Sequence, residues 1–171
     1  CRETWRFSSR WVVARIDCAR SLRARCSILA DGSRKGKSMQ WDLDDQAREF
    51  QQRFDTFCRE SIAPRARDVD RRNAVPTTHW GDLAQAGYLR LFHPAAWGGT
   101  AADGMAQGLA MESLAKACAG TFWAASISTV LCGKLLHDLG SPAHHWDWLR
   151  PIVAGQKIGC FAASENGAGS D

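Results

Sequence analysis

The chain has 171 residues, 45% of them hydrophobic and 23% charged, which is the composition of a soluble globular domain and not of a disordered segment. Its formal charge of +4 is uneven: residues 1–38 hold eight Arg and two Lys against three acids, so residues 39–171 are mildly acidic. An acidic body argues against nucleic acid as the main partner, and no segment approaches the roughly 20 apolar residues that span a bilayer.

The seven cysteines indicate free thiols. They include no C-x-x-C pair, and no His lies at zinc-ligand spacing from two of them, so we expect neither a disulfide framework nor a metal site. Free thiols fit a reducing compartment, which is the cytoplasm or, as the alternative, the mitochondrial matrix.

Residues 1–38 are rich in Arg and Ser, begin with Cys1 instead of Met, and are expected to have little fixed structure. Three interpretations remain open. The preferred one is sequence upstream of a natural start at Met39. The others are an organelle-targeting peptide, which the three acids weaken, and a basic arm for nucleic acid or membranes, for which Trp5 and Trp11 supply only a loose aromatic element.

Helical periodicity begins after Met39. Apolar side chains spaced by three and four predict a first helix with Asp42 as its N-cap, and Pro64 should end or kink that helix. The charged stretch 65–72 is interpreted as a solvated helix face. The apolar stripe of the first helix consists of Leu43, Ala47, Phe50, Phe54 and Phe57.

The next signals surround a short helix. Thr78 is expected to cap a helix over residues 79–86, which Gly87 closes. Residues 88–94 alternate between apolar and polar and are expected to be extended, before a turn at 97–99. His93 precedes a proline and is interpreted as a loop residue, not as a catalyst.

Three longer helices are predicted over residues 103–118, 121–139 and 142–153. The second is apolar on nearly all sides, so it should be central and covered. The adjacent His144 and His145 of the third point about 100° apart and are interpreted as surface residues, not as metal ligands. Together with a short final strand at 158–163, the pattern indicates an all-α, multihelical domain.

Six segments of the chain form a recognisable series. In order they are Phe57-Cys-Arg-Glu-Ser-Ile-Ala-Pro64, Trp80-Gly-Asp-Leu-Ala-Gln-Ala-Gly-Tyr88, Pro94-Ala-Ala-Trp-Gly-Gly99, Met111-Glu-Ser-Leu-Ala-Lys-Ala-Cys-Ala-Gly120, Leu149-Arg-Pro-Ile-Val-Ala-Gly-Gln-Lys-Ile-Gly159 and Phe161-Ala-Ala-Ser-Glu-Asn-Gly-Ala-Gly-Ser-Asp171. Over residues 41–171 this series resembles the N-terminal helical domain of the acyl-CoA dehydrogenase family, up to and including its first flavin-binding signature.

The resemblance implies a fold and a chemistry. The fold is the multihelical orthogonal bundle of that N-terminal domain, with a short terminal strand. The chemistry is α,β-dehydrogenation of an acyl-CoA or other acyl thioester with hydride transfer to FAD. The chain then divides into a basic arm or upstream segment (1–38), the helical domain (39–160) and the start of the flavin-binding loop (161–171).

The same resemblance implies roles for five residues of the final segment. Phe161 packs beside the flavin, backbone N–H groups near Ala163 and Ser164 bind the pyrimidine edge of its ring, and Gly169 permits a close backbone approach. Ser170 reaches the FAD pyrophosphate and the coenzyme A portion of the substrate. The loop departs from the family pattern because Asn166 stands where Pro is usual and Ser164 where Thr is usual; a turn remains compatible with both.

Other implications concern what surrounds this segment. Trp123 falls in a helix that helps line the acyl cavity of relatives, and it is interpreted as a core residue or else as a wall that shortens the pocket. The family's catalytic carboxylate lies in its C-terminal domain and a second flavin-contacting segment in its β-domain, so no catalytic residue is assigned within these 171 residues.

We therefore expect residues 1–171 to be the N-terminal part of a longer, homo-oligomeric enzyme and to be inactive in isolation. The alternative is a truncated, non-catalytic helical protein that pairs with a full-length relative.

Overall fold

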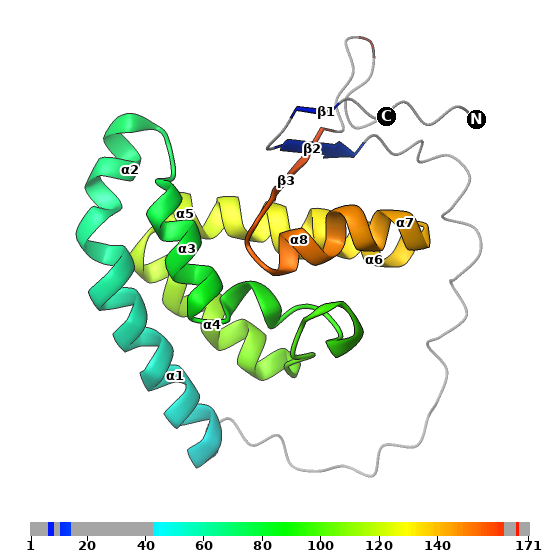
Figure 1. Cartoon of the computed structure of the whole chain (residues 1–171). Coiled ribbons are helices and arrows are strands. Elements are labelled where there is room, and N and C mark those ends of the chain that lie inside the picture. The colour runs from blue at the N-terminus through cyan, green and yellow to red at the C-terminus, as the bar shows by residue number, and fades with distance from the viewer. Residues whose placement is uncertain (1–6, 9–10, 15–42, 163–166, 168–171) are drawn as a thin grey trace.

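The computed structural model describes residues 7–8, 11–14, 43–162 and 167, and over these residues helices dominate, with one small sheet (Figure 1). The α-helices are α1 (Asp45–Phe57), α2 (Ala66–Arg72), α3 (Thr77–Gln85), α4 (Gly104–Ala117), α5 (Ala119–Ala125), α6 (Gly133–Leu139), α7 (Pro142–His144) and α8 (Arg150–Val153). Tighter or wider helical turns are η1 (Cys58–Ile62), η2 (Ala63–Arg65), η3 (Tyr88–Arg90), η4 (Ala95–Trp97), η5 (Ser126–Cys132) and η6 (His145–Leu149). The predicted all-α class is confirmed.

Helix α1 begins at an Asp, although not at the predicted one. Asp44 has an extended backbone and accepts a hydrogen bond from the backbone N–H of Ala47 at 2.8 Å, so it is the N-cap. Asp42, which we expected in that role, lies outside the described residues. The predicted apolar stripe is confirmed for its three aromatic members, because Phe54 is buried and Phe50 and Phe57 pack against the same core, whereas Leu43 precedes the helix.

Pro64 breaks the helix as predicted. The regular turns of α1 give way to the π-turn η1 and then to the 3₁₀ turn η2, which contains Pro64, before α2 resumes. Proline has no N–H and clashes with the carbonyl four residues earlier, so the chain cannot continue as a regular α-helix through it. In α2 the charged residues lie around Val69, which is buried, so the charge run is a solvated face as expected.

Helix α3 starts one residue before the predicted cap. The extended Pro76 precedes it, Thr77 is its first residue, and Thr78 lies inside the helix, so the predicted capping role of Thr78 was wrong. The Thr78 hydroxyl instead accepts a hydrogen bond from Arg65 Nη1 at 3.4 Å. The predicted closure at Gly87 is confirmed, because this residue has φ +78°, a conformation that glycine adopts without strain.

The segment after Gly87 is not extended, which corrects the prediction for residues 88–94. It forms the tight turn η3, in which the N–H of Leu91 donates to the carbonyl of Tyr88 at 3.2 Å. Tyr88, Leu89 and Leu91 are all buried, so the apolar residues face the core from a turn and not from one side of a strand. Alternation over seven residues does not separate these two cases.

The turn predicted at 97–99 is confirmed, and its two glycines have separate reasons. Gly98 has φ +86°, which closes the turn η4. Gly99 has an ordinary φ, but a Cβ there would collide with the backbone carbonyl of His93. The loop from His93 to Gly99 is therefore folded tightly back on itself.

A single long helix, which we call the central helix, runs from Ala119 to Leu139 through α5, η5 and α6. It begins after Cys118, whose extended backbone (φ −160°, ψ 104°) makes the break, so the helix starts two residues before the predicted start at 121. Figure 1 shows it as the yellow helix crossing the molecule, with α7, η6 and α8 alongside its C-terminal half and β3 passing over it.

The central helix is less covered than its composition predicts. Its side chains Ala125, Thr129 and Cys132 are fully buried, but Trp123 is 63% exposed and Leu131 and Leu139 are exposed as well. Length and composition alone would also allow this helix to cross a membrane, a property that core helices of soluble proteins share.

The strand β3 (Ile158–Phe161) joins a three-stranded sheet in the order β1-β2-β3. It pairs in parallel with β2 (Trp11–Ala14), which pairs in antiparallel fashion with β1 (Phe7–Ser8). These two early strands differ from the expectation of little fixed structure in residues 1–38. Pairing with a strand more than 140 residues later is invisible to local sequence patterns.

Candidate functional site

The final strand, β3, ends at the surface of the helical domain with Phe161, the first residue of the predicted cofactor segment. Phe161 is the last residue of β3, and its side chain is 41% exposed. An aromatic ring left uncovered at this point fits a role in packing against a ligand or another domain. Ala163, Ser164, Gly169 and Ser170 lie outside the described residues.

Strand β3 is held on the central helix by one buried hydrogen bond and one close contact. The backbone N–H of Gly159 donates to the hydroxyl Oγ of Ser128 at 2.8 Å. A Cβ at Gly159 would lie 2.7 Å from the Sγ of Cys132, so only glycine lets the strand come this near. Gly159 and its two partners are all buried.

The thiols at this contact and elsewhere in the core are not activated. Burial, with a smaller contribution from Cys160, raises the pKa of Cys132 to about 11. Burial and the nearby Asp55 raise the pKa of Cys58 to about 11 as well. Nucleophilic cysteines need a lowered pKa, so both behave as small apolar core residues. Cys58, Cys118, Cys132 and Cys160 are free thiols.

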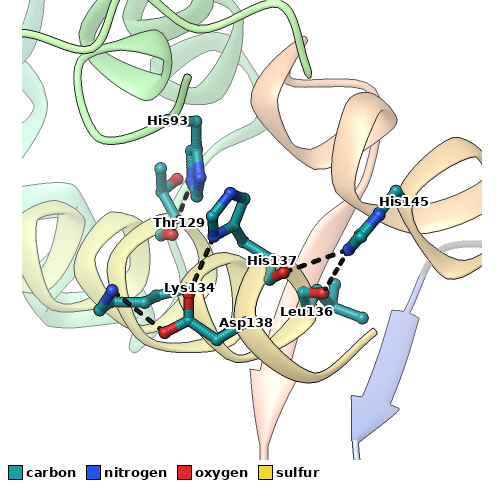
Figure 2. A network of polar contacts seen from close by, with 7 residues as sticks. All are labelled: His93, Thr129, Lys134, Leu136, His137, Asp138 and His145. Carbon is teal, nitrogen blue, oxygen red and sulfur yellow. Dashed lines mark hydrogen bonds and ion pairs between the residues drawn. The ribbon is translucent and has the colours of Figure 1, made fainter. Parts of the chain in front are cut away.

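A polar network lies along the C-terminal half of the central helix (Figure 2). His93 is buried in a loop, as predicted, and its Nε2 donates to the backbone carbonyl of Thr129 at 3.0 Å. Burial lowers the pKa of His93 and outweighs the opposite effect of the hydrogen bond to Thr129, and the nearby His137 and Lys134 also lower it, so the neutral imidazole is favoured. A Cβ at Gly133 would lie 2.7 Å from this ring, which therefore packs directly on the helix backbone.

His145 joins the helix α7–η6 to the end of the central helix, which corrects its interpretation as a surface residue. Its Nε2 donates to the carbonyls of Leu136 and His137 at 3.0 and 3.2 Å (Figure 2). Trp97 packs on the His145 ring with centroids 4.6 Å apart. These carbonyls belong to the last turn of α6 and have few partners within their own helix. The neighbouring His144 completes a capping box with Ser141, the N-cap of α7.

None of these groups forms an acid–base centre. Among the described residues no carboxylate is buried, and the carboxyl whose pKa is shifted, Asp138, has it lowered, first by its hydrogen bond with His137 and then by Lys134. A general base for proton abstraction is most efficient when its pKa lies near the operating pH. The described part of the chain also contains no group of three His, Cys, Asp or Glu side chains that could hold a metal.

Two contributors to this arrangement were missed from the sequence. Ser128 lies within the predicted helix over residues 121–139, but no role was predicted for it. A small polar residue on a buried helix must find a hydrogen-bond partner, so its position was a usable signal although the partner was not. The bridging role of His145 had no such signal, because it depends on two carbonyls of another helix.

The structure also corrects the interpretation of Trp123. It is not a core residue, since most of its indole is exposed on the central helix, where it contacts the ring of Phe122. Leu131 and Leu139, further along the same helix, are exposed as well.

Comparisons with known proteins agree with this fold. The profile of the acyl-CoA dehydrogenase N-terminal domain matches residues 44–156. The mitochondrial short-chain specific acyl-CoA dehydrogenase of Mus musculus is 33% identical over 115 residues, which are 67% of this chain and 28% of that protein. Butyryl-CoA dehydrogenase from Megasphaera elsdenii is 28% identical with a TM-score of 0.66, over 77% of this chain and 35% of that one.

A glutaryl-CoA dehydrogenase from Mycobacterium smegmatis, solved in complex with FADH2, shares the fold with a TM-score of 0.69 at 22% identity, over 75% of this chain and 33% of that one. The chain therefore spans less than a third of the length of the mouse enzyme. The resemblance seen in the six sequence segments is confirmed: this chain belongs to the acyl-CoA dehydrogenase family and contains its N-terminal domain.

Proposed function

We propose that this chain is the N-terminal part of a flavin-dependent oxidoreductase that dehydrogenates an acyl thioester between its α and β carbons. The observation that carries the proposal is the family match over residues 44–156, followed directly by strand β3 and the segment Phe161–Asp171. FAD, when bound, accepts the hydride that leaves the β carbon.

The roles proposed for the final segment follow from the chemistry of its residues. Phe161 packs against the flavin, and backbone N–H groups near Ala163 and Ser164 donate to its pyrimidine edge, where they stabilise negative charge as the ring is reduced. Gly169 permits a close approach, and Ser170 binds the FAD pyrophosphate and the coenzyme A portion of the substrate. The exposed ring of Phe161 supports this proposal, because a planar cofactor would cover it.

We propose that residues 1–171 do not catalyse the reaction by themselves. Among the described residues no carboxylate is placed or tuned to remove the α proton, so the base has to come from other parts of the protein. The oligomer we expect is a homo-oligomer of the natural-length polypeptide.

The compartment we propose is the cytoplasm, where the free thiols remain reduced. The mitochondrial matrix is the alternative if residues 1–38 act as a targeting segment, and the name of the mouse relative places that protein in mitochondria.

A second function is favoured by one observation. The central helix exposes Trp123 and Leu131, and contact with another polypeptide would bury this apolar surface. In this alternative the chain is a non-catalytic helical protein that pairs with a full-length relative.

The two functions are distinguished by the natural polypeptide itself. We expect its intact mass, with peptide sequencing across Asp171, to show a product several times longer than the helical domain that carries stoichiometric FAD. A flavin-free product that co-purifies in a fixed ratio with a longer relative would contradict the enzymatic function and support the alternative.

A further inference from the structure

We propose that Ser128 is a positioning residue for the flavin, because it fixes the strand from which the cofactor-binding segment leaves the helical domain. The inference rests on the proposed function. It assigns to the central helix a role in holding the cofactor-binding strand, which its apolar composition does not indicate.

The first argument is the direction of the Ser128 side chain. A serine inside a helix commonly returns its hydroxyl to the carbonyl four residues earlier, as Ser113 does when its Oγ donates to the carbonyl of Leu109 at 2.9 Å. Ser128 instead accepts a hydrogen bond from the backbone N–H of Gly159, 31 residues later in the chain. Both residues are buried, so without this bond the N–H of Gly159 would have no water to replace it.

The second argument is the separation of helix and strand. A Cβ at Gly159 would lie 2.7 Å from Cys132 Sγ, 2.9 Å from Cys132 Cβ and 3.2 Å from the carbonyl oxygen of Ser128. The strand therefore rests on the helix backbone at this point, and the hydroxyl of Ser128 is long enough to reach it only because of that approach. Glycine and serine act as a pair.

The third argument is the short distance to the cofactor segment. Phe161 lies two residues beyond Gly159, about 7 Å along an extended strand, and its ring is exposed. A strand transmits a displacement along its length, because its backbone is stiff and its register fixed. Loosening the strand at Gly159 therefore moves the place where the flavin-binding residues begin.

The test uses Ser128→Ala in the polypeptide at its natural length, with Ser113→Ala as the matched control. Both changes remove one buried serine hydroxyl from a helix, but only the first breaks the contact with the strand. We expect Ser128→Ala to weaken FAD binding at least about tenfold, from the loss of a buried donor's partner, and to shift the visible absorption maxima of the flavin that remains bound. Ser113→Ala should keep the wild-type affinity and spectrum.

Amide hydrogen exchange gives a readout that needs no flavin. In Ser128→Ala the amide of Gly159 should exchange faster by about tenfold or more, whereas Ser113→Ala should leave it protected. Unchanged FAD affinity and unchanged exchange at Gly159 in Ser128→Ala would overturn the inference while leaving the proposed function intact. A wild-type protein that binds no FAD would overturn the proposed function together with the inference.

A second pair of variants covers the case in which Ser128→Ala does not fold. Gly159→Ala keeps the N–H donor but places its Cβ against Cys132, whereas Gly108→Ala adds a Cβ on helix α4 with no atom within 4 Å. Gly159→Ala should also weaken FAD binding at least about tenfold, and Gly108→Ala should not. Equal FAD affinity in these two variants would likewise overturn the inference.

Discussion

Single residues set the closest approach between the loops and the central helix. His93 packs on Gly133 so tightly that a Cβ there would lie 2.7 Å from both Nε2 and Cε1 of the ring, and the ring is anchored by its bond to the carbonyl of Thr129. Because the imidazole is buried and fixed on both sides, it cannot move away as a surface side chain would.

Gly133→Ala should therefore destabilise the domain although alanine favours helices. We expect a loss of about 1–3 kcal/mol in the free energy of unfolding, measured by urea denaturation, from overpacking in the core. Gly108→Ala is the matched control, because it lies in helix α4 with open space around its Cβ position, and should raise stability by up to about 1 kcal/mol. If the two substitutions changed the free energy of unfolding equally, the close contact between Gly133 and the His93 ring would be contradicted.

Two buried histidines make the stability of the domain depend on pH. His79 is fully buried with Nδ1 against the hydroxyl of Thr121 at 2.9 Å, and burial lowers its pKa, with the nearby Arg65 acting in the same direction against Asp82. Burial also lowers the pKa of His93. Each ring is then neutral when folded but takes up a proton in the unfolded chain.

Because the unfolded state binds more protons below its histidine pKa of about 6.5, stability is complete above that value and falls as the pH drops through it. We expect the urea midpoint to decrease between pH 7.5 and pH 5 by an amount that corresponds to at least about 1 kcal/mol. Replacing both histidines by glutamine should flatten this dependence. A midpoint that stays constant or rises on acidification would show that the two rings are protonated in the folded state.

At the scale of elements, the central helix combines a packed side with an uncovered one. Its inner face packs against β3 and the helices α4 and α8, whereas Trp123 stands on the exposed face. In the 171-residue chain, Trp123→Ala should change the free energy of unfolding by less than about 1 kcal/mol. Leu114→Ala, at a fully buried position of α4, should cost about 2–5 kcal/mol. If Trp123→Ala lowered the free energy of unfolding as much as Leu114→Ala does, the indole of Trp123 would have to be a core side chain, which would contradict its exposure.

Which elements the sequence could predict depended on the kind of signal. Helices α1 and α4 were predictable, because an Asp cap, a long apolar stripe and a defined break all occur locally. The tight turn at 88–91 could not be predicted, since three buried residues at short spacing fit either a strand or a tight helical turn. The pairing of β3 with β2 could not be predicted either, because it joins residues that only the folded chain brings together.

The candidate site divides in the same way. The segment from Phe161 onward was recognisable in the sequence as a family motif. The end of the short strand that leads into it was predicted to within two residues of the observed end. The contact that holds this strand on the helix could not be predicted from the sequence. It joins Ser128, Cys132 and Gly159, which meet only because a strand crosses a helix, and their sequence separations follow no recognisable pattern.

At the scale of the whole molecule, the described residues form a helical platform with one strand fixed at its surface. The platform consists of a core of inert thiols and neutral histidines, a strand fixed on the central helix, and an exposed aromatic ring at its end. Neither a buried carboxylate nor a group of three metal-ligating side chains occurs among these residues. In the reaction that we propose, the catalytic base is contributed by the rest of the natural-length protein.

The most direct test of this account is an anaerobic titration of the purified natural-length protein with a series of acyl-CoA thioesters, followed by the visible absorbance of its flavin. Hydride transfer to bound FAD predicts that at least one saturated acyl-CoA bleaches the flavin band while the corresponding enoyl-CoA is formed in equal amount. A protein that contains no flavin, or a flavin that no acyl thioester of the series reduces, would contradict the proposal that this domain belongs to a working acyl thioester dehydrogenase.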